Sequence, residues 1–363
     1  MLHRRVTGFR PWASAQVRAL VVVSTLARTP GIRGPLRGVR APPLEVELGG
    51  VPVSIYGSGR DAPRPALVFL NGVTARGRHH PEVRRLATAL ARVGFLVAVP
   101  DPPGLASGRI DGDTVTSVVT VVREVADRPE ARAERVGLVG VSIGATLALV
   151  AAEDTHLAAR VTVVAGIAPY TDFVNAVRLA TTAHAFEAGR LVPLQPPGFL
   201  GLVIARSLVA ALPASARRDA LLAELELLPD SAPDPLGRFR SAGCEPEDLR
   251  ALVALLGNRD PRRFDELYEA LPIELRRGIA RLSPLAGAAA LRAPVELVVG
   301  PNDKYLPAAE IRALVAAATG TRVRVTVTSA LRHADTRLTC ANPADLLRFD
   351  GWVVRTIAAA WRP

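Results

Sequence analysis

The sequence contains one serine in a setting that can turn a hydroxyl group into a nucleophile. Ser142 is the middle residue of the pentapeptide at 140–144 (GVSIG), which follows an apolar β-type run (RVGLV) and precedes a helix-forming run (ATLALVAA). A sharp turn between strand and helix presents the serine hydroxyl above the carboxyl edge of a sheet, at a helix N-terminus that favours developing negative charge. We therefore predict that Ser142 is a catalytic nucleophile. The alternative is an ordinary Gly-Ser turn between buried elements.

Two later residues stand where the partners of such a serine are expected. A serine hydroxyl is a weak nucleophile near neutral pH, so an imidazole must accept its proton and a carboxylate must orient the imidazole. In this setting the acid and then the histidine follow the serine, each on a loop after a later strand. Asp303 follows the apolar run VELVV, and His333 follows the run RVRVTVT. The sequence therefore predicts a triad of Ser142, His333 and Asp303.

Other interpretations of these two positions remain open. An Asx turn or a helix cap would also use an aspartate at Asp303, and His333 is also compatible with an ordinary loop histidine. Asp172, at the start of a long helical region, is the second candidate for the acid. Asp335 is a poorer candidate because it shares the loop of His333.

Two backbone amides are candidates for an oxyanion hole. One belongs to Ile143, the residue after the proposed nucleophile. The other lies in the segment LNGVT at 70–74, directly after the apolar run ALVFL. Gly72 permits unusual backbone angles in this segment, and we choose Val73 as the second donor. An ordinary Asn-Gly turn is the alternative interpretation of the segment.

The pattern along the chain indicates how these residues are positioned. From residue 44 onward, short apolar runs alternate with helical periodicities, which predicts parallel strands joined by crossover helices. Between about residues 170 and 282, strand-like runs vanish and helical periodicities with Pro-rich breaks dominate; the alternation then resumes. We therefore predict an α/β catalytic domain formed by 44–169 and 283–363, with an all-helical cap inserted at 170–282.

The motifs resemble those of the α/β-hydrolase superfamily, specifically its capped members. The supporting segments are LNGVT, VPDPPGLASG, GVSIG, SPLAG before VELVVGPND, and LRHAD. The resemblance covers about residues 44–170 and 283–363, and it implies a mostly parallel eight-stranded sheet flanked by helices. Asn71 departs from the family because a histidine is common there. A serine in the turn argues against the haloalkane dehalogenase and epoxide hydrolase branches, whose nucleophile is aspartate.

These observations predict a serine hydrolase that cleaves a carboxylic ester through an acyl-enzyme. The apolar cap favours a small-molecule acyl substrate with a hydrophobic acyl or alcohol part. A thioesterase, acyltransferase or aminopeptidase with the same residues is an alternative, as is a catalytically silent binding module. We expect no cofactor and no metal, since no P-loop, Rossmann, HExxH or EF-hand pattern occurs. The two cysteines, Cys244 and Cys340, also lie outside metal-binding spacings.

The positive charge is concentrated at the start of the chain. Residues 1–40 hold eight arginines and no acidic residue, so only +3 of the net charge of +11 belongs to the rest. Aromatic residues make up 4% of the chain, too few for a base-stacking surface, and we expect no nucleic-acid partner.

Residues 1–43 are predicted to be a basic extension and linker. Their apolar run at 19–27 (ALVVVSTLA) is too short to span a bilayer. The segment is open to three interpretations: an anchor at an anionic membrane surface, a cytosolic extension or wrongly assigned start, or a leader peptide. We expect a cytoplasmic protein with peripheral membrane contact through this segment. Deletion of residues 1–40 is expected to leave the activity unchanged.

Overall fold

The computed structural model describes residues 9–26, 42–59, 62–187, 189–240, 247–301, 303, 308–331 and 342–362. An eight-stranded sheet runs through the centre of this part of the chain, in the order β1-β2-β4-β3-β5-β6-β9-β10. The strands are β1 (Leu44–Leu48), β2 (Val51–Tyr56), β3 (Arg64–Leu70), β4 (Leu96–Pro100), β5 (Ala131–Val141), β6 (Val161–Ile167), β9 (Val295–Val299) and β10 (Val323–Val327).

Most strand pairs in this sheet are parallel. β2 pairs antiparallel with β1 and with β4, and the other neighbouring strands pair in parallel. Gly49 and Gly50 form the turn between β1 and β2 with φ values of 53° and 76°, as a two-residue hairpin with two positive φ angles requires. The prediction of a mostly parallel eight-stranded sheet flanked by helices is confirmed.

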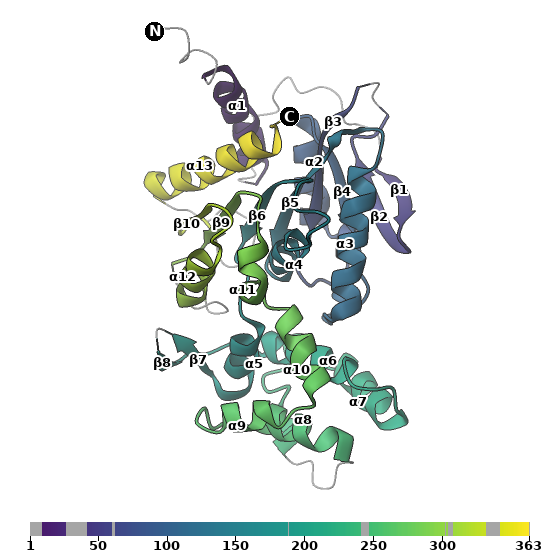
Figure 1. Cartoon of the computed structure of the whole chain (residues 1–363), viewed down its shortest axis with the longest axis vertical. Helices are drawn as coiled ribbons and strands as arrows, with labels where there is room; N and C mark the ends of the chain where they lie inside the picture. The colour runs from purple at the N-terminus through teal and green to yellow at the C-terminus, as the bar shows by residue number, and fades with distance from the viewer. Residues whose placement is uncertain are drawn as a thin grey trace.

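Helices cover both faces of the sheet (Figure 1). One face carries α3 (Gly112–Ala126) and α4 (Ile143–Ala152), with α11 (Pro284–Gly287) packed on α4 and α12 (Ala308–Ala317) packed on α11 and β10. The other face carries α2 (Pro81–Arg92) and α13 (Pro343–Ala360). Because the sheet is covered on both sides, the residues of β3 and β4 are buried throughout, which explains their continuous apolar sequences.

Beyond one end of the sheet lies the segment at 170–282 (Figure 1). Its helices are α5 (Phe173–Thr182), α6 (Gly198–Ala210), α7 (Ala216–Glu226), α8 (Glu247–Gly257), α9 (Phe264–Glu269) and α10 (Ile273–Arg281). The prediction that this segment is all-helical is wrong, because β7 (His184–Glu187) and β8 (Arg190–Pro193) form an antiparallel hairpin. Ala183, with a left-handed φ of 55°, ends α5, and strands of four residues are too short to show alternation.

The first helix belongs to the packed body of the protein. In α1 (Phe9–Leu26), a buried face that includes Ala15, Ala19 and Val22 packs against α13 and α2. Arg18 donates from Nε to the Val93 carbonyl at 3.1 Å, and its guanidinium lies 3.7 Å from the ring centre of Trp361.

This packing corrects the prediction for residues 9–26, which were assigned to the basic extension at 1–43, because part of the apolar run is buried against other helices. A short apolar run gives no signal of a partner helix whose Asp350 accepts a hydrogen bond from Gln16 across 334 residues of chain. None of the helices in the described part of the chain is long and apolar enough to cross a bilayer.

Candidate active site

Ser142 lies at the turn between β5 and α4 with an unusual backbone conformation. Its φ of 53° and ψ of −126° cost a serine about 1–3 kcal/mol. The turn is tight because glycines flank it: a methyl group on Gly140 would lie 2.4 Å from the Ala145 nitrogen, and one on Gly144 would lie 2.1 Å from the Leu70 oxygen. The Ser142 amide donates to the Ile167 carbonyl at 2.7 Å. The ends of β3 and β6 therefore hold the serine in place.

The two candidate oxyanion donors lie beside this serine. Ile143 is the first residue of α4, and amide groups of a first helical turn have no partner within their own helix. A methyl group on Gly72 would lie 3.5 Å from the Ser142 Cβ, so the segment after β3 is in contact with the turn. Val73 follows Gly72 directly and is half-buried. The structure thus brings Val73 and Ile143 to the edge of the sheet where Ser142 lies.

Asp303 lies after β9 at the same edge of the sheet and is half-buried. The register explains this position: Val141 pairs with Ile167 on β6, and Ile167 pairs with Val298 on β9. Ser142 and Asp303 therefore follow β5 and β9, which lie on either side of β6 and end at the same edge of the sheet. His333 lies outside the described residues; in the sequence it follows β10, whose Val327 pairs with Val299.

The second candidate for the acid has a different role in the structure. Asp172 caps α5: its Oδ1 accepts hydrogen bonds from the amides of Val174 at 2.9 Å and Asn175 at 3.2 Å. This is the usual arrangement of an N-cap aspartate. Among the described residues, no three His, Cys, Asp or Glu side chains are grouped as metal ligands would be.

The segment that carries Val73 is anchored by a carboxylate to which no sequence motif assigned a role. Asp101, after β4, accepts a hydrogen bond from the Arg78 amide at 2.7 Å and forms an ion pair with the Arg78 guanidinium. A methyl group on Gly77, which has a φ of 46°, would lie 2.1 Å from the Asp101 Oδ1. Arg78 also pairs with Glu45 at 3.2 Å. The only sequence signal for Asp101 was its place in VPDPPGLASG, one of the segments that support the family resemblance.

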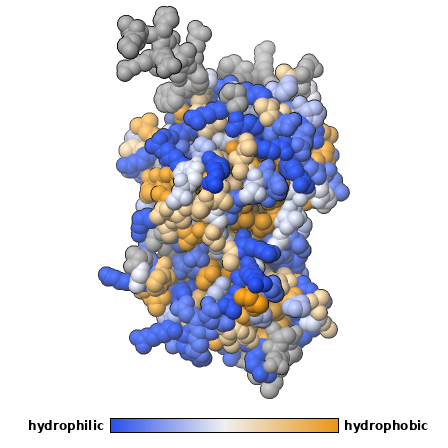
Figure 2. Space-filling view, in the orientation of Figure 1, coloured by the Kyte–Doolittle hydropathy of each residue, from blue (hydrophilic) through white to orange (hydrophobic). Residues whose placement is uncertain are grey.

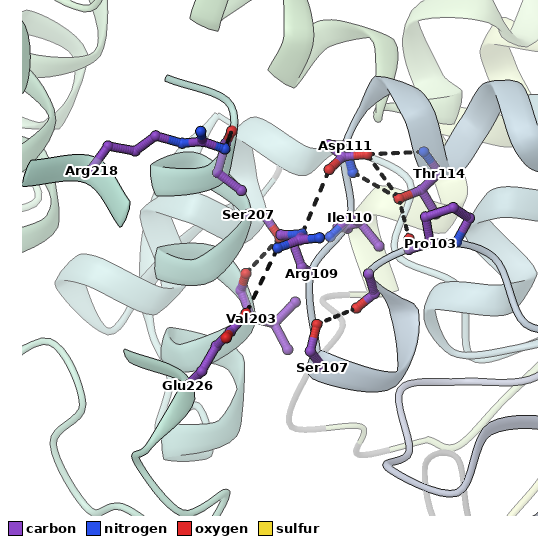
Figure 3. Close-up of polar contacts among 12 residues, drawn as sticks. Pro103, Ser107, Arg109, Ile110, Asp111, Thr114, Val203, Ser207, Arg218 and Glu226 are labelled. Atoms are coloured by element: carbon purple, nitrogen blue, oxygen red, sulfur yellow. Dashed lines mark hydrogen bonds and ion pairs between the residues drawn. The ribbon is translucent and has the colours of Figure 1, made fainter. Parts of the chain in front are cut away.

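The segment at 170–282 contacts the sheet-bearing part next to this site. The Ile110 amide donates to the Ser207 Oγ of α6 at 3.0 Å (Figure 3). Buried Arg206 donates to the Ser107 carbonyl at 3.1 Å. A methyl group on Gly108 would lie 3.2 Å from Arg206 Nη1, 3.5 Å from Val73 Cγ1 and 3.6 Å from Val203 Cγ2, so α6 lies next to the segment after β3.

The surface near this contact is partly apolar. On the face shown in Figure 2, hydrophobic residues gather around the middle height of the molecule. At this height the helices of 170–282 approach the sheet-bearing part (Figure 1).

Comparison with solved structures identifies the fold. The structure is similar to acylaminoacyl peptidase from Pyrococcus horikoshii, with a TM-score of 0.50 and 12% identity over 85% of this chain and 39% of the peptidase. It is similar to DphMB1 with a TM-score of 0.50 and 19% identity, over 90% of this chain and 89% of that one. The carboxylesterase EstE1, cloned from a metagenomic library, gives a TM-score of 0.49 and 16% identity over 96% and 98%.

The chain therefore has the α/β-hydrolase fold that its sequence motifs implied. It spans well under half the length of the Pyrococcus peptidase. No protein-family model and no curated protein sequence matches it. At identities this low the structural likeness establishes the fold, and the chemistry must be argued from the residues.

Proposed function

We propose that the protein is a serine hydrolase that cleaves carboxylic esters. The observation that carries this proposal is the backbone of Ser142, which has a positive φ at the turn between β5 and α4. Strain at a non-glycine residue persists only where the surrounding structure enforces it, and such positions cluster at active sites. At Ser142 this conformation presents the hydroxyl group at the N-terminus of the buried helix α4, beside a segment whose backbone amide can donate a hydrogen bond.

The proposed reaction has two stages. The Ser142 Oγ attacks the ester carbonyl carbon while His333 accepts the hydroxyl proton, and Asp303 orients His333. The amides of Ile143 and Val73 donate to the negatively charged oxygen that forms. The alcohol then leaves with the proton from His333. In the second stage a water molecule, deprotonated by His333, attacks the acyl-enzyme and releases the carboxylic acid and the free serine.

We further propose that residues 170–282 act as a cap over this site. The contact of Val203 with the region around Val73 and Gly108 supports an apolar covering next to the oxyanion segment. A covered apolar pocket favours esters with a hydrophobic acyl or alcohol part. Such a substrate would gain binding energy from the cap, which a short acetyl ester would lack.

A fluorophosphonate probe tests the nucleophile. The intact protein should be labelled, Ser142→Ala should not be labelled, and p-nitrophenyl esters with chains of two to twelve carbons should show a preference for longer chains. Absence of labelling in the intact protein would overturn the proposal, and labelling that survives Ser142→Ala would overturn the choice of nucleophile. Acyl thioesters and aminoacyl anilides, assayed in parallel, identify a thioesterase or an aminopeptidase.

The acid is tested by a matched pair of variants. Asp303→Asn should lower kcat by about three to four orders of magnitude, because the imidazole loses its orienting carboxylate. Asp172→Asn should leave kcat near its original value, because asparagine caps helices about as well as aspartate. The opposite result would assign the acid to Asp172. His333→Ala should lower the rate by several decades with the fold retained, as judged by circular dichroism.

A further inference from the structure

A buried carboxyl group lies where the chain leaves the sheet for the helical segment. Glu310, in the first turn of α12, is 6% exposed. Its Oε1 accepts a hydrogen bond from Asn175 Nδ2 at 2.7 Å, and its Oε2 accepts one from the Thr171 amide at 3.3 Å. The Thr171 hydroxyl donates to the Glu310 carbonyl at 3.1 Å. Three hydrogen bonds therefore tie the first turn of α12 to the start of the helical segment.

The same place joins the two connections between the helical segment and the sheet. The Leu285 amide, on the returning connection, donates to the Thr171 carbonyl at 2.8 Å. The Phe173 amide donates to the Ser283 Oγ at 2.9 Å. Thr171 is fully buried and uses its amide, carbonyl and hydroxyl in these contacts. We call this cluster the Thr171 junction: Thr171, Phe173, Asn175, Ser283, Leu285 and Glu310.

The hydrogen bonds at the junction have a fixed direction. Asn175 Oδ1 accepts a hydrogen bond from the Phe186 amide at 2.8 Å, so its Nδ2 must face Glu310 as a donor. Both carboxyl oxygens of Glu310 thus face donors, an arrangement that only the ionised carboxylate satisfies fully.

Burial and the neighbouring negative charge of Asp172 oppose the ionisation of Glu310. Burial, with the nearby negative charge of Asp172, raises the pKa of Glu310 to about 7, although the hydrogen bond from Asn175 lowers it. Tyr170 faces the same carboxylate from the outgoing connection, and burial and Glu310 both raise the pKa of its hydroxyl. The next charged residue on α12, Arg312, pairs with Glu187 of β7 at 3.4 Å.

We propose that Glu310 is a positioning residue that sets the placement of Asp303, an inference that rests on the proposed function. The connection that carries Asp303 runs from the end of β9 at Val299 to the start of α12 at Ala308. The sheet fixes its first end, and the Thr171 junction fixes its second end through Glu310. The acid of the triad is thereby tied to the base of the cap.

Exchanging the carboxylate and the amide between positions 310 and 175 tests this inference. In Glu310→Gln, the new side-chain oxygen can accept from Thr171, but the new amide nitrogen faces the Asn175 amide nitrogen. If the Asn175 amide rotates by 180°, its nitrogen instead faces the Phe186 amide, which is also a donor. In the double variant Glu310→Gln/Asn175→Asp, carboxylate and amide exchange places, and every donor again faces an acceptor.

Ester hydrolysis is the first measurement. Glu310→Gln should lower kcat about tenfold with little change in KM, because a displaced acid affects the chemical step. The double variant should recover to within about threefold of the original kcat. Glu153→Gln is the matched control, since it removes a half-buried glutamate at the end of α4 whose pKa is also raised by burial; it should leave kcat unchanged.

Hydrogen exchange of the intact protein is the second measurement, and it does not depend on activity. Peptides that cover Thr171 and Asp303 should exchange faster in Glu310→Gln, at the original rate in Glu153→Gln, and near the original rate in the double variant. If the protein hydrolyses no ester, the proposed function fails, while these exchange rates still decide whether Glu310 fixes the junction.

Three results would overturn the inference. One is that Glu310→Gln exchanges no faster than Glu153→Gln at these peptides. Another is that a folded double variant exchanges as fast as Glu310→Gln. The third is an unchanged kcat in Glu310→Gln while Ser142 still reacts with the fluorophosphonate. If the double variant does not fold, the comparison of Glu310→Gln with Glu153→Gln decides alone.

Discussion

At the scale of single residues, the conformation of Ser142 depends on the absence of side chains beside it. A methyl group on Gly144 would lie 2.1 Å from the backbone oxygen of Leu70, which cannot move without disturbing β3. We predict that Gly144→Ala lowers the free energy of unfolding by about 3 kcal/mol or more and slows fluorophosphonate labelling of Ser142. Urea-induced unfolding, followed by circular dichroism, measures the first effect.

Gly278→Ala is the control for this substitution. Gly278 lies within α10 with no heavy atom within 4 Å of an added methyl group, so alanine there should stabilise the protein by up to about 1 kcal/mol. If Gly144→Ala unfolded at the same urea concentration as the original protein, the tight contact between the turn and β3 would be refuted.

The residues whose positions in the fold could be predicted from the sequence are those whose signal is local. Ser142 and Ile143 lie in one pentapeptide between a strand and a helix, and Asp303 comes four residues after the end of an apolar run. The roles of Asp101 and Glu310 depend on contacts with Arg78 and Asn175, which are 23 and 135 residues away in the chain. The spacing of these residues along the sequence does not predict such long-range contacts. The catalytic roles of all these residues stay predictions, and His333 also lies outside the described part.

At the scale of elements, the strands of the sheet were predictable because most are buried on both faces and read as short apolar runs. The hairpin of β7 and β8 was missed because it lies largely at the surface: Phe186 and Leu191 are 52% and 38% exposed. Its strands, HAFE and RLVP, therefore mix apolar with polar or charged residues and show no continuous apolar run of strand length. The packing of α1 was missed for another reason. The sequence of an amphipathic helix predicts that one face is buried but does not identify the surface against which it packs.

The segment after β3 should depend on Asp101. We predict that Asp101→Asn lowers kcat for p-nitrophenyl esters by roughly 10–100-fold, because a neutral amide cannot both accept from the Arg78 amide and neutralise its guanidinium. The amide of Val73 would then be less well positioned. KM should change little. Glu82→Gln is the control. Glu82 lies in the first turn of α2, next to the same segment, and it forms an ion pair with Arg85 at 3.0 Å. Equal activity of the two variants would contradict this role.

The placement of α1 predicts unequal effects for two positions two residues apart. Ala19 is fully buried and Val17 is 62% exposed. Ala19→Arg should lower the free energy of unfolding by about 3 kcal/mol or more, because a long charged side chain cannot fit against α13. Val17→Arg should change it by less than about 0.5 kcal/mol. Thermal unfolding of both variants measures the difference. Equal melting temperatures would mean that α1 does not pack against α13.

At the scale of the whole molecule, two glutamates, the buried Glu310 and the half-buried Glu153, should make stability depend on pH. Burial raises the pKa of Glu153 to about 8 and that of Glu310 to about 7, above their ordinary value of 4.5. Between pH 4.5 and 8 the folded protein therefore binds more protons than the unfolded chain, and stability must fall as the pH rises. Below about pH 4 the direction reverses, because hydrogen bonds and ion pairs hold the pKa of Asp234 and of Asp345 below the ordinary value.

We predict that the free energy of unfolding is higher at pH 5 than at pH 8.5 by about 2–4 kcal/mol, measured by urea titration at constant ionic strength. Glu153 supplies part of this slope because its carboxyl group lies at the C-terminal end of α4 and, among the described residues, its Oε1 is buried without a hydrogen-bond partner. Glu153→Gln should therefore stabilise the protein at pH 8.5 by roughly 1–2 kcal/mol and leave it unchanged at pH 5. Stability that rose from pH 5 to pH 8.5, or a Glu153→Gln variant with the original slope, would mean that the two carboxyl groups ionise normally in the folded protein.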